Sequence, residues 1–257
     1  MFRWDVVWHF LFQDPNLIFL NAAWITLWLS VVSQTSGVIL GLFLALMRMS
    51  RFPLLSRVAG AYIWFFRGSP LLVQVLLLWD GLPKIFPSLL LADWACIIVA
   101  FSLNEGAYMA EIIRAAITSV DPGQMEAAKS LGMRYPLAMR RVVLPQAARV
   151  IIPPLGNEFN NMLKTTSIAS VIGLQELTGS AEVYGSQAFV IFELLIVATF
   201  YYLLLTTVWG YIQGWIENRL DPDRVQTRID LEDKKSFAQR LVGFGGSRSG
   251  GTLVSGR

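Results

Sequence analysis

The sequence has 257 residues, of which 54% are hydrophobic and 15% are charged, and its mean hydropathy is +0.52. A soluble domain is about 25% charged because its surface must stay hydrated, so the composition excludes an ordinary water-soluble protein. The net charge of +3 is not gathered into a Lys/Arg-rich patch on a polar domain, which argues against nucleic-acid binding. Cys96 is the only cysteine and His9 the only histidine, which excludes intrachain disulfides, His-based triads and most zinc sites.

Five segments are apolar enough to cross a bilayer, which takes roughly 20 residues of helix. In chain order they are residues 22–47, 58–79, 94–116, 150–172 and 188–213. In the first segment Ser33, Gly37, Gly41 and Ala45 repeat every fourth residue, a pattern of small side chains typical of close helix packing. We therefore expect an all-α integral membrane protein of about five transmembrane helices, with its membrane domain in residues 1–220.

The basic residues of the connecting loops predict the orientation of the chain. Residues 48–57 carry three Lys/Arg and residues 117–149 carry five. Of the other loops, residues 80–93 carry one and residues 173–187 carry none. Because basic loops stay in the cytoplasm, we expect the amino terminus outside and the carboxyl terminus in the cytoplasm. Residues 221–257 combine charges of both signs with a Gly/Ser-rich end, which favours a largely disordered cytoplasmic tail.

The loop of residues 117–149 contains a short helix with a signal at each end. Asp121 is a suitable N-cap, Pro122 suits the first helical position, and Gln124 completes an Asp-x-x-Gln capping box. Gly132 favours the left-handed conformation that ends a helix. A helix of this length is unstable alone, so we expect it to lie against another surface.

The same loop carries a spaced pattern made of Glu126, Ala127, Ala128, Gly132, Val142, Leu144 and Pro145. The pattern resembles the EAA motif in the permease subunits of bacterial ABC-type importers, where Glu-Ala-Ala, glycine and Leu-Pro have these spacings. The resemblance continues through residues 67–74, 107–114 and 164–167. These three segments are similar to the polar amino-acid branch, the histidine, glutamine, glutamate and arginine-type permeases.

The resemblance implies a type I ABC importer permease fold in the bacterial inner membrane, in a transport subunit that is not itself an enzyme. It implies that the residues coupled to an ATPase are Glu126, Ala127, Ala128, Gly132, Leu144 and Pro145. The implied partners are two cytoplasmic ATPases that bind ATP and Mg, a second permease subunit (an identical copy or a related chain), membrane lipid, and an extracytoplasmic binding protein that delivers a polar amino acid. The sequence has no Gly-x-x-x-x-Gly-Lys-Ser/Thr phosphate loop, so we expect no catalytic residue, metal or cofactor in this chain.

Polar side chains at membrane depth are the candidates for a substrate path, because an ionisable group there costs about 2.5–3.5 kcal/mol and normally faces protein or water. Asn157, Asn160, Asn161 and Lys164 share one helical face of the fourth segment. The predicted path residues are Arg67, Gln74, Asn104, Glu105, Tyr108, Glu111, Asn157, Asn160, Lys164 and Ser167. Carboxylates, amides and cations together suit an amino acid, whose ammonium and carboxylate each need a partner once dehydrated.

The two loops that are poor in basic residues are expected outside, where the binding protein implied by the resemblance docks. They are short, and segments 80–93 and 173–187 carry Lys84, Glu182 and Tyr184, which are the predicted docking residues.

Several alternatives remain open at this point. In one alternative, the polar groups of the spans pair with one another and line no substrate path. The spacing of Glu111 and Arg114 permits such a pair. An opine, cystine or another small polar solute is an alternative cargo. An ion-coupled carrier could use Glu105 or Glu111 for protons. An intramembrane enzyme could use Ser167 with Lys164, but such an enzyme gives the EAA pattern no role. ATP-dependent uptake that survives an uncoupler separates an importer from an ion-coupled carrier.

Overall fold

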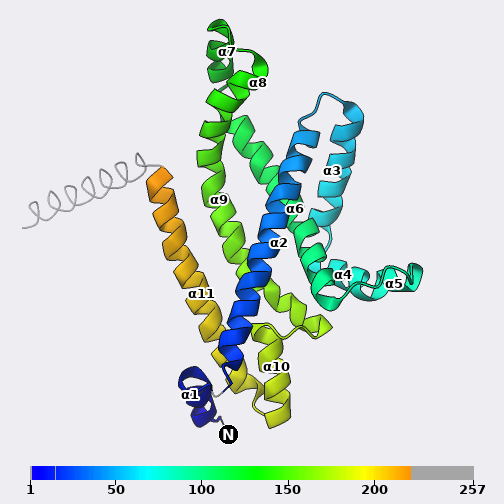
Figure 1. Ribbon diagram of the computed structural model, residues 1–257, viewed down its shortest axis with the longest axis vertical. Coiled ribbons are helices and arrows are strands. Elements are labelled where there is room, and N and C mark those ends of the chain that lie inside the picture. Colours follow the sequence, from blue (N-terminus) through cyan, green and yellow to red (C-terminus); the bar gives the residue numbers. More distant parts are fainter. Residues whose placement is uncertain (1, 15, 221–257) are drawn as a thin grey trace, which may run out of the picture. The chain divides into compact units, whose positions relative to one another are not determined.

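A computed structural model describes residues 2–14 and 16–220. Every regular element in this part of the chain is helical, which confirms the all-α expectation (Figure 1). The elements are α1 (Trp4–Phe12), α2 (Ile18–Arg48), α3 (Pro53–Gly68), α4 (Leu71–Leu76), the π-helix η1 (Leu77–Gly81), α5 (Leu82–Ile85), α6 (Asp93–Ser119), α7 (Pro122–Ser130), α8 (Tyr135–Ala138), the π-helix η2 (Met139–Val143), α9 (Leu144–Thr165), the 3-10 helix η3 (Thr166–Ile172), α10 (Leu177–Ala188) and α11 (Ile191–Leu220). The expected tail, residues 221–257, lies outside the described residues.

The chain divides into two compact units, Met1–Gln213 and Gly214–Arg257. The first unit holds α1 to α10 and most of α11. The described part of the second unit is the end of α11 from Gly214 to Leu220, where the Arg219 guanidinium lies over the Trp215 ring at 4.2 Å. Both candidate sites described below lie in the first unit.

Three described helices are long and apolar enough to cross a membrane, namely α2, α6 and α11. A fourth span is present if α3 and the helical segment after it count as one bent span. The remaining expected span, residues 150–172, corresponds to α9 and η3. In the described structure α9 does not pass the same test of length and composition, because it contains Pro153, Pro154 and several polar side chains.

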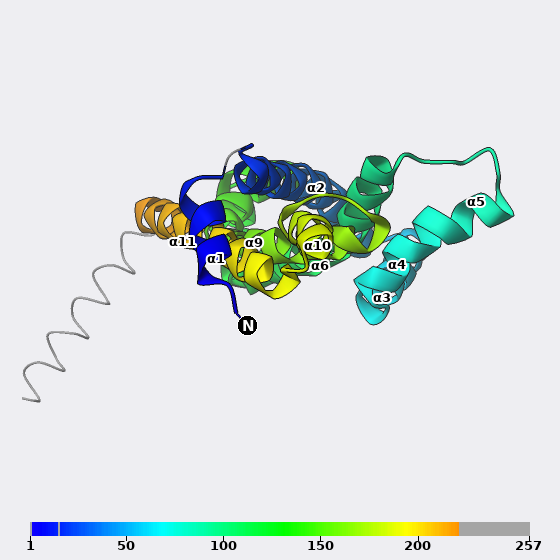
Figure 2. The same cartoon turned by 90° about the horizontal axis from the view of Figure 1, so that it is seen from below.

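The expected second span, residues 58–79, is not one straight helix. It breaks between α3 and the next helix, which are bent by 105°. Pro70 has no N–H to continue the helix and disfavours a helical residue before it; Ser69 accordingly has the extended angles φ −110° and ψ 146°. Figures 1 and 2 show α4 and α5 extending to one side of α2 and α6 as a result.

The helices α2 and α6 form the closest packed pair of the first unit. Ser33, Gly37, Gly41 and Ala45 are all buried, which confirms the predicted packing face. Gly37 faces Glu105, and Gly41 faces Met109 and Ala110. Because residues later in α2 meet residues later in α6, the two helices are parallel.

The other long helices alternate in direction around this pair. Met162 shares a core cluster with Ile97 near the start of α6, whereas Ala147 shares one with Ile113 near its end, so α9 is antiparallel to α6. Trp209 Nε1 of α11 donates a hydrogen bond to the Gly156 carbonyl of α9 at 2.8 Å. Tyr202 OH, earlier in α11, donates to Glu176 beyond the end of α9 at 2.5 Å. The order of these contacts makes α11 antiparallel to α9.

Substituting Gly41 with alanine is expected to destabilise the protein, whereas Gly210→Ala serves as a matched control. A Cβ at Gly41 would lie 2.9 Å from the Ala110 nitrogen and closer still to Met109, and backbone cannot move aside cheaply. A Cβ at Gly210 meets nothing within 4 Å, and alanine is favoured over glycine inside a helix by about 1 kcal/mol. Thermal unfolding of the two purified variants in detergent should show a lower Tm for Gly41→Ala alone. Equal Tm values would contradict the close packing of α2 on α6.

Candidate functional site

The short helix α7 has the predicted N-cap at its start and the predicted left-handed glycine after its end. The Asp121 side chain accepts a hydrogen bond from the Gly123 N–H at 2.8 Å, and Pro122 is the first helical residue. Gly132 has φ +80°, a left-handed conformation that favours glycine. The predicted capping box is not completed, since the Gln124 side-chain oxygen accepts from Gln146 Nε2 at 3.3 Å instead. Packing of α7 against η2 brings these two glutamines together.

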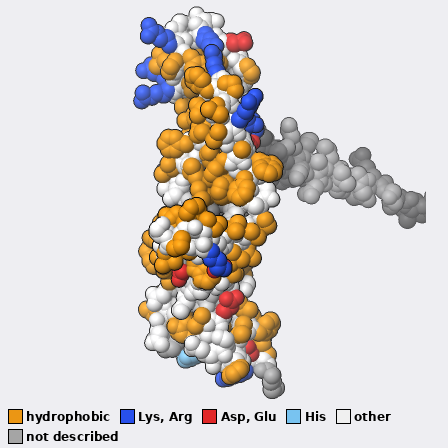
Figure 3. Space-filling model, turned by 90° about the vertical axis from the view of Figure 1, so that its right-hand side faces the viewer, with side chains coloured by type: hydrophobic (Ala, Val, Ile, Leu, Met, Phe, Trp, Pro, Cys, Tyr) orange, Lys and Arg blue, Asp and Glu red, His pale blue; other side chains and the backbone are white. Residues whose placement is uncertain are grey.

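We call the segment from α7 to the start of α9 the coupling loop (residues 121–145). The EAA-motif residues within it differ in how exposed they are. Ala128 is only 4% exposed, because α7 packs on α8 and η2 of the same chain. Glu126, Ala127, Gly132, Leu144 and Pro145 are exposed. Beside them Leu131 is 80% exposed, and Tyr135 and Leu137 are also exposed. Lys and Arg side chains gather at this end of the unit (Figure 3).

A cavity of about 450 Å³ lies between α6 and α9, and we call it the α6–α9 cavity. Seven of the ten residues that line it have polar side chains, and none of the ten belongs to the coupling loop. The residues that line it are Leu71, Asn104, Glu105, Tyr108, Glu158, Asn161, Met162, Lys164, Thr165 and Ile168. Four of the predicted path residues, Asn104, Glu105, Tyr108 and Lys164, are therefore brought together.

Two of the charged side chains that line this cavity have no polar partner among the described residues. In the described part of the chain, neither Glu158 nor Lys164 forms a salt bridge or a side-chain hydrogen bond. The third charged group, Glu105, is buried and accepts a hydrogen bond from Gln34 Nε2 at 2.9 Å. A polar guest therefore finds a free cation and a free carboxylate on α9 and a partly satisfied carboxylate on α6.

Gln74, predicted to line the path, instead holds the bend between α3 and α4. Its Nε2 donates to the Phe66 carbonyl at 2.9 Å and to Ser69 Oγ at 2.8 Å. Asn104 Nδ2 donates to the same Phe66 carbonyl at 3.0 Å and to Gln74 Oε1 at 3.1 Å. These bonds satisfy a carbonyl that the helix break leaves free. Asn104 thus joins the bend to the cavity wall.

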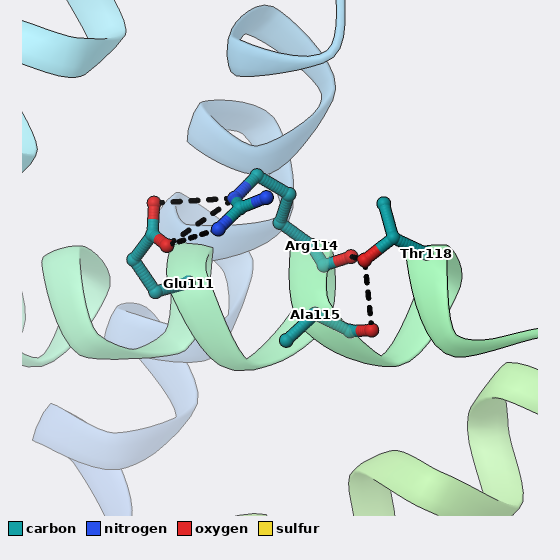
Figure 4. A network of polar contacts seen from close by, with 4 residues as sticks. All are labelled: Glu111, Arg114, Ala115 and Thr118. Atoms are coloured by element: carbon teal, nitrogen blue, oxygen red, sulfur yellow. Dashed lines mark hydrogen bonds and ion pairs between the residues drawn. The ribbon is translucent and has the colours of Figure 1, made fainter.

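Glu111, also predicted for the path, lies away from the α6–α9 cavity. Its carboxylate accepts from Arg114 Nη2 at 2.7 Å and from Arg114 Nε at 3.2 Å (Figure 4). Both residues line a separate pocket with Arg48 and Thr118. The pairing alternative therefore describes this residue. Arg67 is exposed, and its guanidinium lies 5.2 Å from the centre of the Tyr108 ring.

The remaining predicted path residues on α9 and η3 face other neighbours. Asn157 Oδ1 accepts from Gln213 Nε2 of α11 at 3.2 Å. Ser167 Oγ donates to the Lys164 carbonyl at 2.8 Å and lines a second cavity of about 420 Å³ against α11. Lys164 borders both cavities. Asn160 is half-buried and lines neither of them.

Glu158, Asn161 and Thr165 line the α6–α9 cavity but are absent from the predicted path residues. Asn161 belongs to the polar face that the sequence pattern identified. Glu158 had a signal as well, since a carboxylate inside a bilayer-crossing segment is costly and normally serves a function.

The predicted docking residues lie on α5 and α10. Lys84 of α5 is exposed and pairs with Asp80 at 2.5 Å. Glu182 of α10 is exposed, whereas Tyr184 is half-buried and packs on the core cluster that joins α1, α2, α10 and α11.

Comparison with known proteins places this geometry in a family. Residues 37–222 match the family described as the binding-protein-dependent transport system inner membrane component. The chain is 39% identical over 244 residues to the arginine transport system permease protein of Corynebacterium glutamicum (88% of this chain, 74% of that protein). It is 40% identical over 217 residues to the octopine transport system permease protein of Rhizobium meliloti (80% of this chain, 88% of that protein).

A solved structure gives the same result for the fold. The crystal structure of an amino acid ABC transporter with histidines superposes with a TM-score of 0.76 at 42% identity, covering 80% of this chain and 96% of that chain. The helices, the coupling loop and these similarities agree with one another. The chain therefore belongs to the binding-protein-dependent transport system inner membrane components, and it is a multi-pass permease subunit of an ABC importer in the bacterial inner membrane.

Proposed function

We propose that this permease subunit moves a polar amino acid through the α6–α9 cavity. The observation that carries the proposal is the presence of Lys164 and Glu158, both without a salt bridge among the described residues, in one cavity. An amino acid that leaves water needs a cation for its carboxylate and an acceptor for its ammonium group, since charged hydrogen bonds are the strong ones. Lys164 would meet the carboxylate, and Glu158 or Glu105 the ammonium group or a cationic side chain.

The names of the relatives support the class of cargo. The Corynebacterium relative is named for arginine and the Rhizobium relative for octopine. An opine or another small polar solute such as cystine is the second candidate. The test is a binding screen of polar amino acids and opines against the cognate binding protein, followed by uptake of the hits by the complete importer. Uptake of an apolar solute only would contradict the proposal.

The orientation and the span count are part of the proposal. The chain would cross the membrane five times, with the amino terminus outside and α7 in the cytoplasm. Two features support this arrangement. The helices α2, α6 and α11 run in one direction and α9 runs in the opposite one, as five crossings require when α3 is the crossing between α2 and α6. Lys and Arg also gather at the α7 end (Figure 3). Basic loops stay inside.

The coupling loop would bind a cytoplasmic ATPase. That ATPase would bind ATP and Mg, since the sequence of this subunit has no phosphate-loop motif. Leu131, Tyr135 and Leu137 are exposed at the end of the unit where Lys and Arg side chains gather. Exposed apolar side chains rimmed by charge are typical of an interface. Ala128 would act inside the loop by letting α7 approach α8 and η2, and not by direct contact with the ATPase. Two ATPases and a second permease subunit, identical or related, would complete the importer.

The binding protein would dock at the opposite end, on the segments of Lys84 and Glu182. Cysteines placed at these two exposed positions are expected to crosslink to the binding protein in the assembled importer, whereas a cysteine at Lys129 of α7 should not. The measurement is the crosslinked product on a denaturing gel in each nucleotide state. Crosslinking from Lys129 but from neither of the other two positions would invert the proposed orientation.

A further inference from the structure

The helix α1 has three distinct faces around its axis. Val7 is buried, and Phe10 and Leu11 pack beside it on a core cluster. Asp5, His9 and Gln13 form a polar stripe, in which His9 Nδ1 lies 3.0 Å from Gln13 Oε1. The third face, which we call the aromatic stripe, consists of Trp4, Trp8 and Phe12, which recur every fourth residue.

The first face fixes α1 to the rest of the unit. The cluster on which it packs contains Phe19 of α2, Leu177 of α10 and Leu194 of α11. The Arg3 N–H also donates to Glu193 Oε1 at 3.0 Å. The turn into α2 is fixed as well, because the Asp14 carboxylate accepts from the Ile18 and Phe19 N–H groups at 2.8 and 2.9 Å. Thus α1 is held within one short turn of a bilayer-crossing helix.

The aromatic stripe has no cover in the described structure. Trp4 is 63%, Trp8 60% and Phe12 70% exposed, although the Trp8 and Phe12 rings stack on each other at 5.0 Å. The exposed apolar surface continues onto the first turns of α2, where Leu20 and Trp24 are exposed. A face of this kind is costly in water, since removing large apolar side chains from water is favourable.

We propose that α1 is an interfacial anchor whose aromatic stripe lies in the lipid headgroup region of the membrane, with Asp5 and His9 facing water. Three observations select lipid as the occupant. Tryptophan is enriched at the membrane–water interface. The helix α1 directly precedes α2, which is long and apolar enough to cross the bilayer. The exposed Leu20 and Trp24 continue the stripe along that helix. An amphipathic helix with one aromatic face and one polar face lies in the plane of the interface. Because the α1 segment is bonded to Glu193 and packs on the core cluster, an α1 anchored in lipid would also hold the first turns of α10 and α11 in place.

The test is the accessibility of a spin label at single positions of α1. Cysteine is placed at Trp8, Phe12, Asp5 or His9, one at a time, in the full chain with its partner subunits, reconstituted into vesicles of phosphatidylethanolamine and phosphatidylglycerol. Cys96 is buried, and a sample without an introduced cysteine measures its background. Relaxation by oxygen, which concentrates in lipid, is compared with relaxation by a water-soluble nickel chelate.

The expected result is an oxygen-to-nickel ratio several-fold higher at positions 8 and 12 than at positions 5 and 9. Ratios at 8 and 12 that are no higher would place the stripe in water and overturn the proposal. Low accessibility to both reagents at 8 and 12 would also overturn it, because a protein surface, such as a second copy of the chain, would then cover the stripe.

Discussion

Lys164→Met is expected to lower substrate uptake by about 30-fold or more, since leaving a buried charge without its partner costs about 2–5 kcal/mol. The substrate carboxylate would enter the α6–α9 cavity and find no cation on its lining, where Glu105 and Glu158 are the other charged groups. Methionine keeps most of the lysine stem, so folding and assembly should persist. The measurement is initial uptake by the reconstituted importer, with the amount of assembled complex determined in the same samples.

A matched control removes a polar group on the same helix outside the cavity. Asn160 is half-buried on α9 but lines neither cavity, so Asn160→Leu should retain uptake within a few-fold of the unmodified chain. Normal uptake by Lys164→Met, or an equal loss in both variants, would show that the polar face of α9 is structural and that the cavity is not the path.

Two substitutions in the coupling loop are expected to abolish coupling for different reasons. Leu131→Asp removes the most exposed apolar side chain of the loop and should weaken ATPase binding by about 30-fold or more, the size of an interface hot spot at 2 kcal/mol. The loop itself should stay folded. Ala128→Arg, in contrast, forces a long charged side chain between α7 and η2, where overpacking alone costs about 1–3 kcal/mol.

Limited proteolysis of the loop together with co-purification of the ATPase distinguishes the two effects. Leu131→Asp should lose the ATPase while the loop resists protease, and Ala128→Arg should lose both. Ser130→Asp is a matched control for added charge, since Ser130 is exposed and its hydroxyl only donates to the Glu126 carbonyl in its own helix. Retention of the ATPase by Leu131→Asp would contradict the proposed docking surface.

Local signals in the sequence predicted those elements that depend on a few neighbouring residues. The cap at Asp121 and the left-handed Gly132 follow from the preferences of these residue types, and the structure has both. The small-residue face containing Gly37 and Gly41 was predictable because its four-residue repeat leaves only one use, the close approach of a second helix.

The composition of the cavity was less predictable, because it depends on which neighbour covers each part of a helix. Asn157 and Lys164 share a face of α9, yet Asn157 bonds to α11 and Lys164 reaches the cavity beside α6. Helix periodicity gives the face and not the neighbour. Gln74 is a similar case: its partner, the Phe66 carbonyl, is free only because the helix breaks after Gly68.

Glu111 was assigned to the path from its depth and from the helical face that it shares with Asn104 and Tyr108. Its spacing to Arg114 already allowed an ion pair within one helix, and the structure has that pair at 2.7 Å. A charged side chain at membrane depth indicates a functional path most reliably when no partner lies three or four residues away. Glu158 meets this condition, with no basic residue at those distances.

The most direct test of the central claim is transport by the complete importer in vesicles loaded with ATP. We expect accumulation of a polar amino acid that requires ATP and the binding protein and persists when a protonophore removes the proton gradient. Leu131→Asp in the same vesicles should abolish it. Uptake that proceeds without ATP and stops on addition of the protonophore would contradict the account and identify an ion-coupled carrier.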